Sequence, residues 1–147
     1  MKKLLILTIL ACTISIQAQN WKKGLAVVGY HTATIALGAV ADGLYDEGHK
    51  EWSHALHAVE VGTVLSGPFI FKPRGSSEIV SYLLSYGFLR FSLFDSFYNM
   101  TRDLPVFYNG STSAYDRAMA KIPEHGRAWY KGCSLVIGIA IPIKEMR

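Results

Sequence analysis

The sequence predicts an all-α protein: a small antiparallel four-helix bundle, embedded in a membrane and preceded by an N-terminal signal segment. Half of the 147 residues are hydrophobic and only 18% are charged, and the mean hydropathy is +0.21, a balance that favours a membrane setting. Four apolar segments of helical length alternate with connections rich in charge, glycine or proline. The few ionisable residues inside the apolar segments recur at helical spacing.

The first eighteen residues, MKKLLILTILACTISIQA, have the layout of a secretory signal: two lysines, an apolar core, then small and polar residues. Cleavage after Ala18 would leave residues 19–147 as a single helical domain. Two alternatives stay open. The run that ends at Cys12 resembles the lipobox of bacterial lipoproteins, which would place an acylated chain in the periplasm or outer membrane. The segment could also remain as an anchor, although it is short for the roughly 20 residues of a span.

The mature chain would carry little net charge. The formal charge of +4 falls to +2 without the two lysines of the leader, and the remaining basic residues form no stripe interleaved with aromatics. This pattern argues against a nucleic-acid partner. Cys133 would be the one cysteine left, so no intramolecular disulfide could form. Its apolar neighbours predict a buried packing thiol.

The first predicted helix covers residues 25–41, LAVVGYHTATIALGAVA, which carry no formal charge and are the best candidate span. Its Gly29, Ala33 and Ala36 form a small-residue stripe, which predicts the close approach of another helix. The acidic stretch 42–51, DGLYDEGHKE, has two glycines and no periodicity, so we expect a solvated loop there. It lacks the spacing of a calcium loop.

The second predicted helix covers residues 52–71, with a break or kink near Pro68. His54, His57 and Glu60 follow one another at intervals of three and lie on a broad common face of this helix. A helix that carries such side chains in an apolar stretch must bury them, pair them or expose them to water. We expect them to face the interior of the bundle.

The third predicted helix covers residues 78–100, with Ser76 and Ser77 as candidate caps. Arg90 and Asp95 interrupt its aromatic and aliphatic run. Because they are five residues apart, they project away from each other and form no local pair.

A polar face continues beyond the end of that helix. Asp95, Asn99 and Arg102 follow i, i+4, i+7 spacing and therefore share one side. We expect this face to extend the polar positions of the second helix.

The stretch 103–127 looks the most soluble. Ser113 and Asp116 fit a capping box that opens a short helix over residues 114–122. A last apolar run, residues 129–143, precedes a charged tail. All three tryptophans stand at the starts of apolar segments, as in the aromatic belts of membrane proteins.

Together these positions define a predicted polar cluster from three helices. Its members are His31, His54, His57, Glu60, Arg90, Asp95, Asn99 and Arg102. The favoured interpretation is structural: Glu60 pairs with Arg90 on the neighbouring helix, and His54, His57 and Asp95 complete a hydrogen-bonded interior. Charges inside an apolar helix are costly unless they are paired.

Two chemical interpretations remain beside the structural one. His54, His57 and Glu60, joined by His31 and Asp95, could bind zinc or iron, because imidazole and carboxylate suit these metals and helix bundles build such sites from facing side chains. A histidine could instead act as a general base on a lipid or cell-wall substrate at the membrane. The sequence contains no G-x-S-x-G motif and no phosphate-binding glycine loop, and we nominate no catalytic residue.

The sequence therefore predicts a small bacterial envelope protein of structural or interaction type, placed in the inner membrane, with the lipid bilayer as its partner and no cofactor. The alternative is a metal-dependent or acid–base enzyme at the membrane.

Overall fold

The computed structural model describes residues 21–108, 110 and 114–146. The predicted signal segment, Cys12 and the capping residue Ser113 lie outside this part. Within it the chain is all-α, as predicted, and contains no strand. The helices are α2 (Trp21–Asp46), α3 (Lys50–Phe71), α4 (Gly75–Thr101), α5 (Ala114–Ala120) and α6 (Glu124–Glu145).

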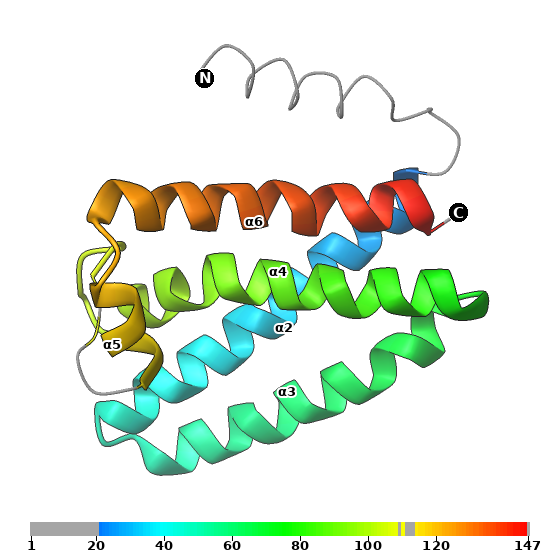
Figure 1. Cartoon of the computed structure of the whole chain (residues 1–147). Coiled ribbons are helices and arrows are strands. Elements are labelled where there is room, and N and C mark those ends of the chain that lie inside the picture. Colours follow the sequence, from blue (N-terminus) through cyan, green and yellow to red (C-terminus); the bar gives the residue numbers. More distant parts are fainter. Residues whose placement is uncertain (1–20, 109, 111–113, 147) are drawn as a thin grey trace.

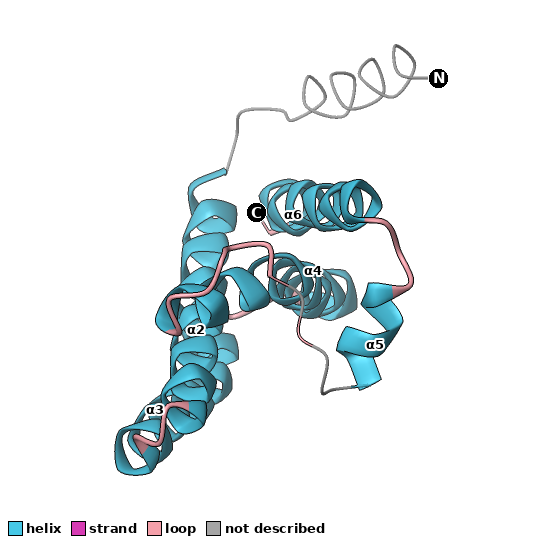
Figure 2. Cartoon of the chain, turned by 90° about the vertical axis from the view of Figure 1, so that its left-hand side faces the viewer, coloured by secondary structure: helices cyan, strands magenta, loops and turns pink. Residues whose placement is uncertain are grey.

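The four long helices run in alternating directions, and the short α5 precedes α6 (Figure 1). Helix α2 is central because it packs on α3, α4 and α6. Helices α4 and α6 lie along each other, and α2 crosses them obliquely (Figures 1 and 2). Helix α3 follows α2 on the side away from α6, so it is the most peripheral of the four.

Helix α2 can occupy the centre because its buried face is built from small and short polar residues. The buried positions are Gly24, Val27, His31, Thr34, Ile35, Gly38, Ala39, Ala41 and Gly43. A Cβ added at Gly24 would lie 2.5 Å from the Cα of Ile143 on α6, and one at Gly43 would lie 2.9 Å from the Cβ of Thr101 on α4. Glycine is therefore required where the helices approach most closely.

The small-residue stripe predicted for helix contact is on the wrong face. Gly29 and Ala33 are exposed, and a Cβ at Gly29 would meet nothing within 4 Å. Gly29 is five residues from Gly24, which places it about 140° around the helix from the contact face. Composition identified the right residue types, but the choice between two small-residue faces depends on the neighbouring helices.

The predicted loop over residues 42–51 is also wrong, because α2 continues to Asp46 and only three residues separate it from α3. Two contacts hold this last turn: Gly43 packs on Thr101, and Asp42 bonds to His57. Of the break or kink expected near Pro68, the break does not occur, whereas the predicted helix end at Phe71 is confirmed. Helix α3 runs through Pro68 to Phe71 and ends at a left-handed Lys72.

Helix α4 begins earlier than predicted, at Gly75, and neither Ser76 nor Ser77 caps it. Its first turn is held instead by Glu78, whose carboxylate accepts the backbone N–H of Arg74 at 2.9 Å. A carboxylate at this position satisfies one of the free donors at a helix N-terminus.

Large apolar side chains cover the outer surfaces of the long helices. On α3, α4 and α6 the exposed ones include Val59, Val61, Leu65, Phe69, Ile70, Ile79, Val80, Leu83, Leu84, Val136 and Ile137. Cys133 is exposed among them, which contradicts the predicted buried thiol. It lies five residues, and so about 140°, from Gly138, which packs on Leu89 of α4.

Polar side chains occupy the inside of the same helices. Beside Tyr82 and Leu89, α4 buries the polar residues Glu78, Ser81, Ser85, Ser92 and Asn99, whereas α3 buries only Ser53 and Gly67. By length and composition α2 is the one described helix that could cross a membrane, a test that a buried core helix also passes. The apolar exterior, and an interior in which polar side chains lie beside apolar ones such as Ile35 and Leu89, are the features that the function must explain.

Candidate functional site

Helix α4 makes one ion pair with each of the other long helices. The three pairs are Glu78 with Lys23 of α2 at 3.0 Å, Arg90 with Glu60 of α3 at 3.3 Å, and Asp95 with Lys131 of α6 at 2.6 Å. Each pair neutralises a charge that would otherwise be stranded on an apolar helix. The Glu60–Arg90 contact is the one that the sequence predicts.

Four ionisable residues in contact with one another, Asp42, His57, Glu60 and Arg90, connect α2 through α3 to α4, and we call them the polar chain. His57 Nε2 lies 3.1 Å from Asp42 Oδ1, and His57 Nδ1 lies 3.1 Å from Glu60 Oε2. Arg90 Nη1 donates to the other Glu60 oxygen at 3.3 Å and to the Tyr86 hydroxyl at 3.2 Å.

The hydrogen-bond inventory of His57 limits what this ring can do. Carboxylate oxygens only accept hydrogen bonds, so satisfying both contacts requires an N–H on each ring nitrogen. The polar chain then alternates acidic and basic groups from Asp42 to Arg90. Both nitrogens are engaged, and neither is left to take a proton from a substrate.

Glu60 can reach this position because residue 38 of α2 has no side chain. A Cβ added at Gly38 would overlap the Glu60 carboxylate. Only 12% of the Glu60 side chain is exposed, against 39% for Arg90 and 37% for His57. The Glu60 carboxylate is therefore the most enclosed group of the polar chain, and the side chains of Arg90 and His57 are more exposed to solvent.

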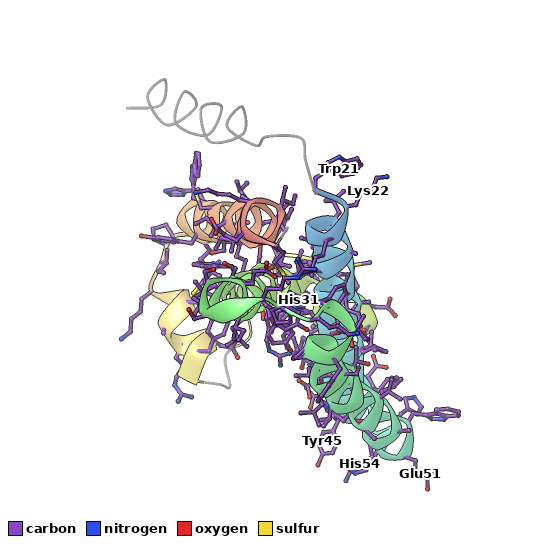
Figure 3. All side chains as sticks on the ribbon, turned by 90° about the vertical axis from the view of Figure 1, so that its right-hand side faces the viewer. Trp21, Lys22, His31, Tyr45, Glu51 and His54 are labelled. Carbon is purple, nitrogen blue, oxygen red and sulfur yellow. The ribbon has the colours of Figure 1, made fainter. Side chains whose placement is uncertain are left out.

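His31 forms a separate buried contact rather than part of the polar chain. Ser85 Oγ donates to the backbone carbonyl of Gly138 on α6 at 2.7 Å and lies 3.4 Å from His31 Nδ1. The rings of Tyr82 and Tyr86 approach its imidazole edge-on, with centroids 4.4 and 5.4 Å away. His31 thus helps to connect α2, α4 and α6 (Figure 3).

The predicted metal set is not assembled. His54 is exposed and projects outward at the end of α3 (Figure 3), where its ring lies 6.3 Å from that of Tyr45. It is six residues from Glu60, a rotation of about 120°. In the described part of the chain no group of three His, Cys, Asp or Glu residues could hold a metal ion. His57 bridges its two carboxylates and does not converge with them on one point.

Four residues of the predicted polar cluster do come together. Arg90, Asp95, Asn99 and Arg102 line one cavity of about 620 Å³ between α4, α5 and the connection after α4. We call it the α4 cavity. Its further walls include Phe91, Phe94, Tyr98, Tyr108, Tyr115 and Asp116.

Specific contacts hold the walls of the α4 cavity in place. Asn99 Nδ2 donates to the carbonyls of Val106 at 3.1 Å and Tyr108 at 2.9 Å, which fixes the connection against α4. The Tyr115 ring contacts Phe91 edge-on at 6.2 Å. Its hydroxyl donates to Asp95 Oδ2 at 3.4 Å, the oxygen that Lys131 also contacts.

Burial, together with the negative charge of Asp95, raises the pKa of the Tyr115 hydroxyl to about 12. At neutral pH this hydroxyl is therefore a hydrogen-bond donor and carries no charge.

Sequence reasoning missed Asp42, Lys131 and Tyr115 as members of these sites. One signal could have found Asp42. The short turn at 47–49 makes α2 and α3 an antiparallel hairpin, in which Asp42, five residues before the turn, and His57, eight residues after it, lie near the same end. Lys131 and Tyr115 had no comparable local signal, because their partner Asp95 is far away in the sequence.

Comparisons with protein-family models, with curated proteins and with solved structures found no match to this chain.

Proposed function

We propose that this chain is a helical protein of the bacterial cell envelope, embedded in the lipid bilayer of the inner membrane, with a structural or interaction role. In this proposal the polar chain holds the helices together. One observation supports it most directly: many large apolar side chains lie outside, whereas short polar ones share the interior with the apolar core. Phe69 is 78% exposed, Leu65 65% and Leu83 61%, whereas Ser85 and Asn99 are buried.

This distribution suits hydrocarbon better than water. Apolar surface that extends over three helices would favour aggregation of a protein in water, whereas lipid tails solvate it. Inside a bilayer, helices associate through small residues and polar contacts because lipid removes the hydrophobic driving force. The close approach at Gly24 and the Ser85 bond to α6 are contacts of that kind.

The lengths of the helices are compatible with spanning. Helices α3 and α6 each contain 22 residues, which corresponds to about 33 Å at 1.5 Å per residue, close to the roughly 30 Å of a hydrocarbon core. Trp21 lies at one end of the bundle, whereas Trp52 and Trp129 lie at the other, and all three are exposed. This placement is typical of interfacial belts.

By composition alone α3, α4 and α6 would not be chosen as membrane-spanning helices, because each carries charged residues. Glu60 and Arg90, near the middle of α3 and α4, and Asp95, in the last two turns of α4, have partners of opposite charge on a neighbouring helix. Paired charges that face a bundle interior are the form in which membrane helices tolerate them.

The geometry gives less support to an acid–base enzyme. His57 has both ring nitrogens engaged, His31 is enclosed by two tyrosine rings, and His54 stands alone beside Tyr45. A general base needs a free nitrogen within reach of its substrate.

The proposal can be tested by fractionating bacteria that express the full-length chain. We expect the protein in the membrane pellet after alkaline carbonate extraction, and in the inner-membrane band of a density gradient. Release by carbonate would overturn the bilayer placement. An outer-membrane location that is lost in the Cys12→Ser variant would instead establish the lipoprotein alternative.

A further inference from the structure

The α4 cavity has the size and walls of a small-molecule site. Its volume of about 620 Å³ falls within the roughly 300–1,000 Å³ of typical ligand pockets. Five aromatic rings line it, those of Phe91, Phe94, Tyr98, Tyr108 and Tyr115. Aromatic faces attract cations through the ring quadrupole, and clusters of them bind quaternary and primary ammonium groups.

The charged groups of the cavity balance one another. Two arginines, Arg90 and Arg102, and two aspartates, Asp95 and Asp116, face the same space. Arg102 also lies 3.6 Å from Asp46 outside the cavity, and Asp95 contacts Lys131. The formal charges of these four residues therefore sum to zero, and the cavity does not select for an anion by its net charge.

The arginines retain donors for a ligand. Arg90 and Arg102 contact carboxylate and tyrosine oxygens through Nη1 only, as far as the described residues are concerned. A guanidinium has five N–H donors, so Nη2 and Nε of both residues can still bind a phosphate. The Arg90 guanidinium lies over the Phe94 ring at 4.4 Å, which fixes its plane beside the cavity.

We propose that the α4 cavity binds the headgroup of a zwitterionic aminophospholipid, with the ammonium group against the rings of Tyr108 and Tyr115 and the phosphate at Arg102, the arginine at the end of α4. The inference rests on the bilayer placement proposed above. The cavity follows the second half of α4 from Gly87 to Arg102, and its Arg102 end lies at the end of the bundle that also carries the exposed Trp52 and Trp129. That is the depth at which phospholipid headgroups lie.

The test is native mass spectrometry of the full-length chain in mild detergent, titrated with three probes. These are short-chain phosphatidylethanolamine, short-chain phosphatidylglycerol and water-soluble glycerophosphoethanolamine. We expect one phosphatidylethanolamine per chain, bound about tenfold more tightly than phosphatidylglycerol, the difference that an ammonium group in an aromatic cage can supply. Glycerophosphoethanolamine should bind more weakly than the lipid, because it lacks the acyl chains.

Two neighbouring aromatic residues offer a matched pair of variants. Tyr108 lines the α4 cavity, whereas Phe107 does not, and both are exposed. Tyr108→Ala should lower the affinity for phosphatidylethanolamine about fivefold. Phe107→Ala should leave it unchanged, and Tyr108→Phe should retain most of it. Circular dichroism of each variant shows whether the helices are intact.

Several outcomes would overturn the inference. Equal affinity for phosphatidylglycerol, or no effect of Tyr108→Ala in a folded protein, would mean that the lipid is adventitious. Equally tight binding of glycerophosphoethanolamine would make a free solute the ligand. Absence of headgroup binding by a protein that resists carbonate extraction would remove the lipid site and leave the bilayer placement standing.

Discussion

At the scale of single residues, Glu60 is the point where three helices meet. Its carboxylate packs on Gly38 of α2, accepts from His57 on its own helix and pairs with Arg90 of α4. A carboxylate enclosed in this way is tolerated only because both oxygens are satisfied. Removal of its charge therefore affects two partners at once.

We predict that Glu60→Gln lowers the free energy of unfolding by about 1 to 2 kcal/mol, since it leaves His57 and Arg90 without their shared carboxylate. Arg90→Met should cost less in the Glu60→Gln background than alone. Unfolding in mixed micelles with increasing SDS measures both. Additive costs would contradict the pair, and Glu145→Gln, at the exposed pair with Lys144, serves as the neutral control.

Tyr115 provides a pH-dependent prediction. Its pKa is raised from 10.0 to about 12 by burial and by Asp95, so the fold favours the neutral hydroxyl. The stabilisation is complete below pH 10 and is lost as the pH rises towards 12. The tyrosinate absorbance of the wild type minus that of Tyr115→Phe should rise with a midpoint near 12. A midpoint near 10 would show that the ring is fully solvated.

At the scale of elements, α2 determines how closely the helices pack. Its contact glycines are placed where α6, α3 and α4 pass it, at Gly24, Gly38 and Gly43 respectively. Helix α3 buries far less of its surface, and contacts from α2 and α4, including Tyr30 to Thr63 and Arg90 to Glu60, hold it in place. The position of α3 thus depends on polar contacts, whereas the position of α2 depends on close packing at its glycines.

Two alanine substitutions in α2 separate these roles. A Cβ at Gly24 would meet the backbone of Ile143, which cannot move aside without shifting α6, whereas a Cβ at Gly29 would meet open space. Gly24→Ala should therefore lower the stability by about 2 kcal/mol or more. Gly29→Ala should raise it by up to about 1 kcal/mol, because alanine has the higher helix propensity. The SDS titration above measures both, and equal effects would refute the α2–α6 contact.

At the scale of the whole molecule, the exposed apolar side chains have opposite consequences in water and in a lipid bilayer. The same outward side chains that would be a liability in water are the surface that a bilayer requires. The ion pairs of α4 then compensate the charges that each of the other helices brings inside.

A matched pair of valine substitutions tests this directly. Val61 lies at the middle of α3 and is 55% exposed, whereas Val106 lies in the connection after α4 and is 43% exposed. At the centre of a spanning helix Val61→Asp should cost about 3 kcal/mol and reduce the carbonate-resistant fraction. Val106→Asp should have little effect. In a water-soluble bundle both changes would stay within about 0.5 kcal/mol, and equal behaviour would count against the membrane.

The sequence by itself determined the all-α class, the number and order of the long helices, the short helix before the last one and the pairing of Glu60 with Arg90. These follow from the lengths of the apolar runs, and from the cost of unpaired charge on helices that are neighbours in sequence. The shared cavity of Arg90, Asp95, Asn99 and Arg102 was only partly foreseeable. Helical spacing placed three of them on one face. It did not predict that α5 and the connection after α4 form the opposite wall of the cavity.

Only the tertiary structure decided which small-residue face of α2 makes contact, that α2 runs on to Asp46, that His54 points away from the cluster, and that Lys131 and Tyr115 meet Asp95. Each of these depends on a neighbour that is distant in the sequence. Local periodicity specifies the direction of a side chain around its own helix, but the crossing positions of the helices decide what that side chain meets.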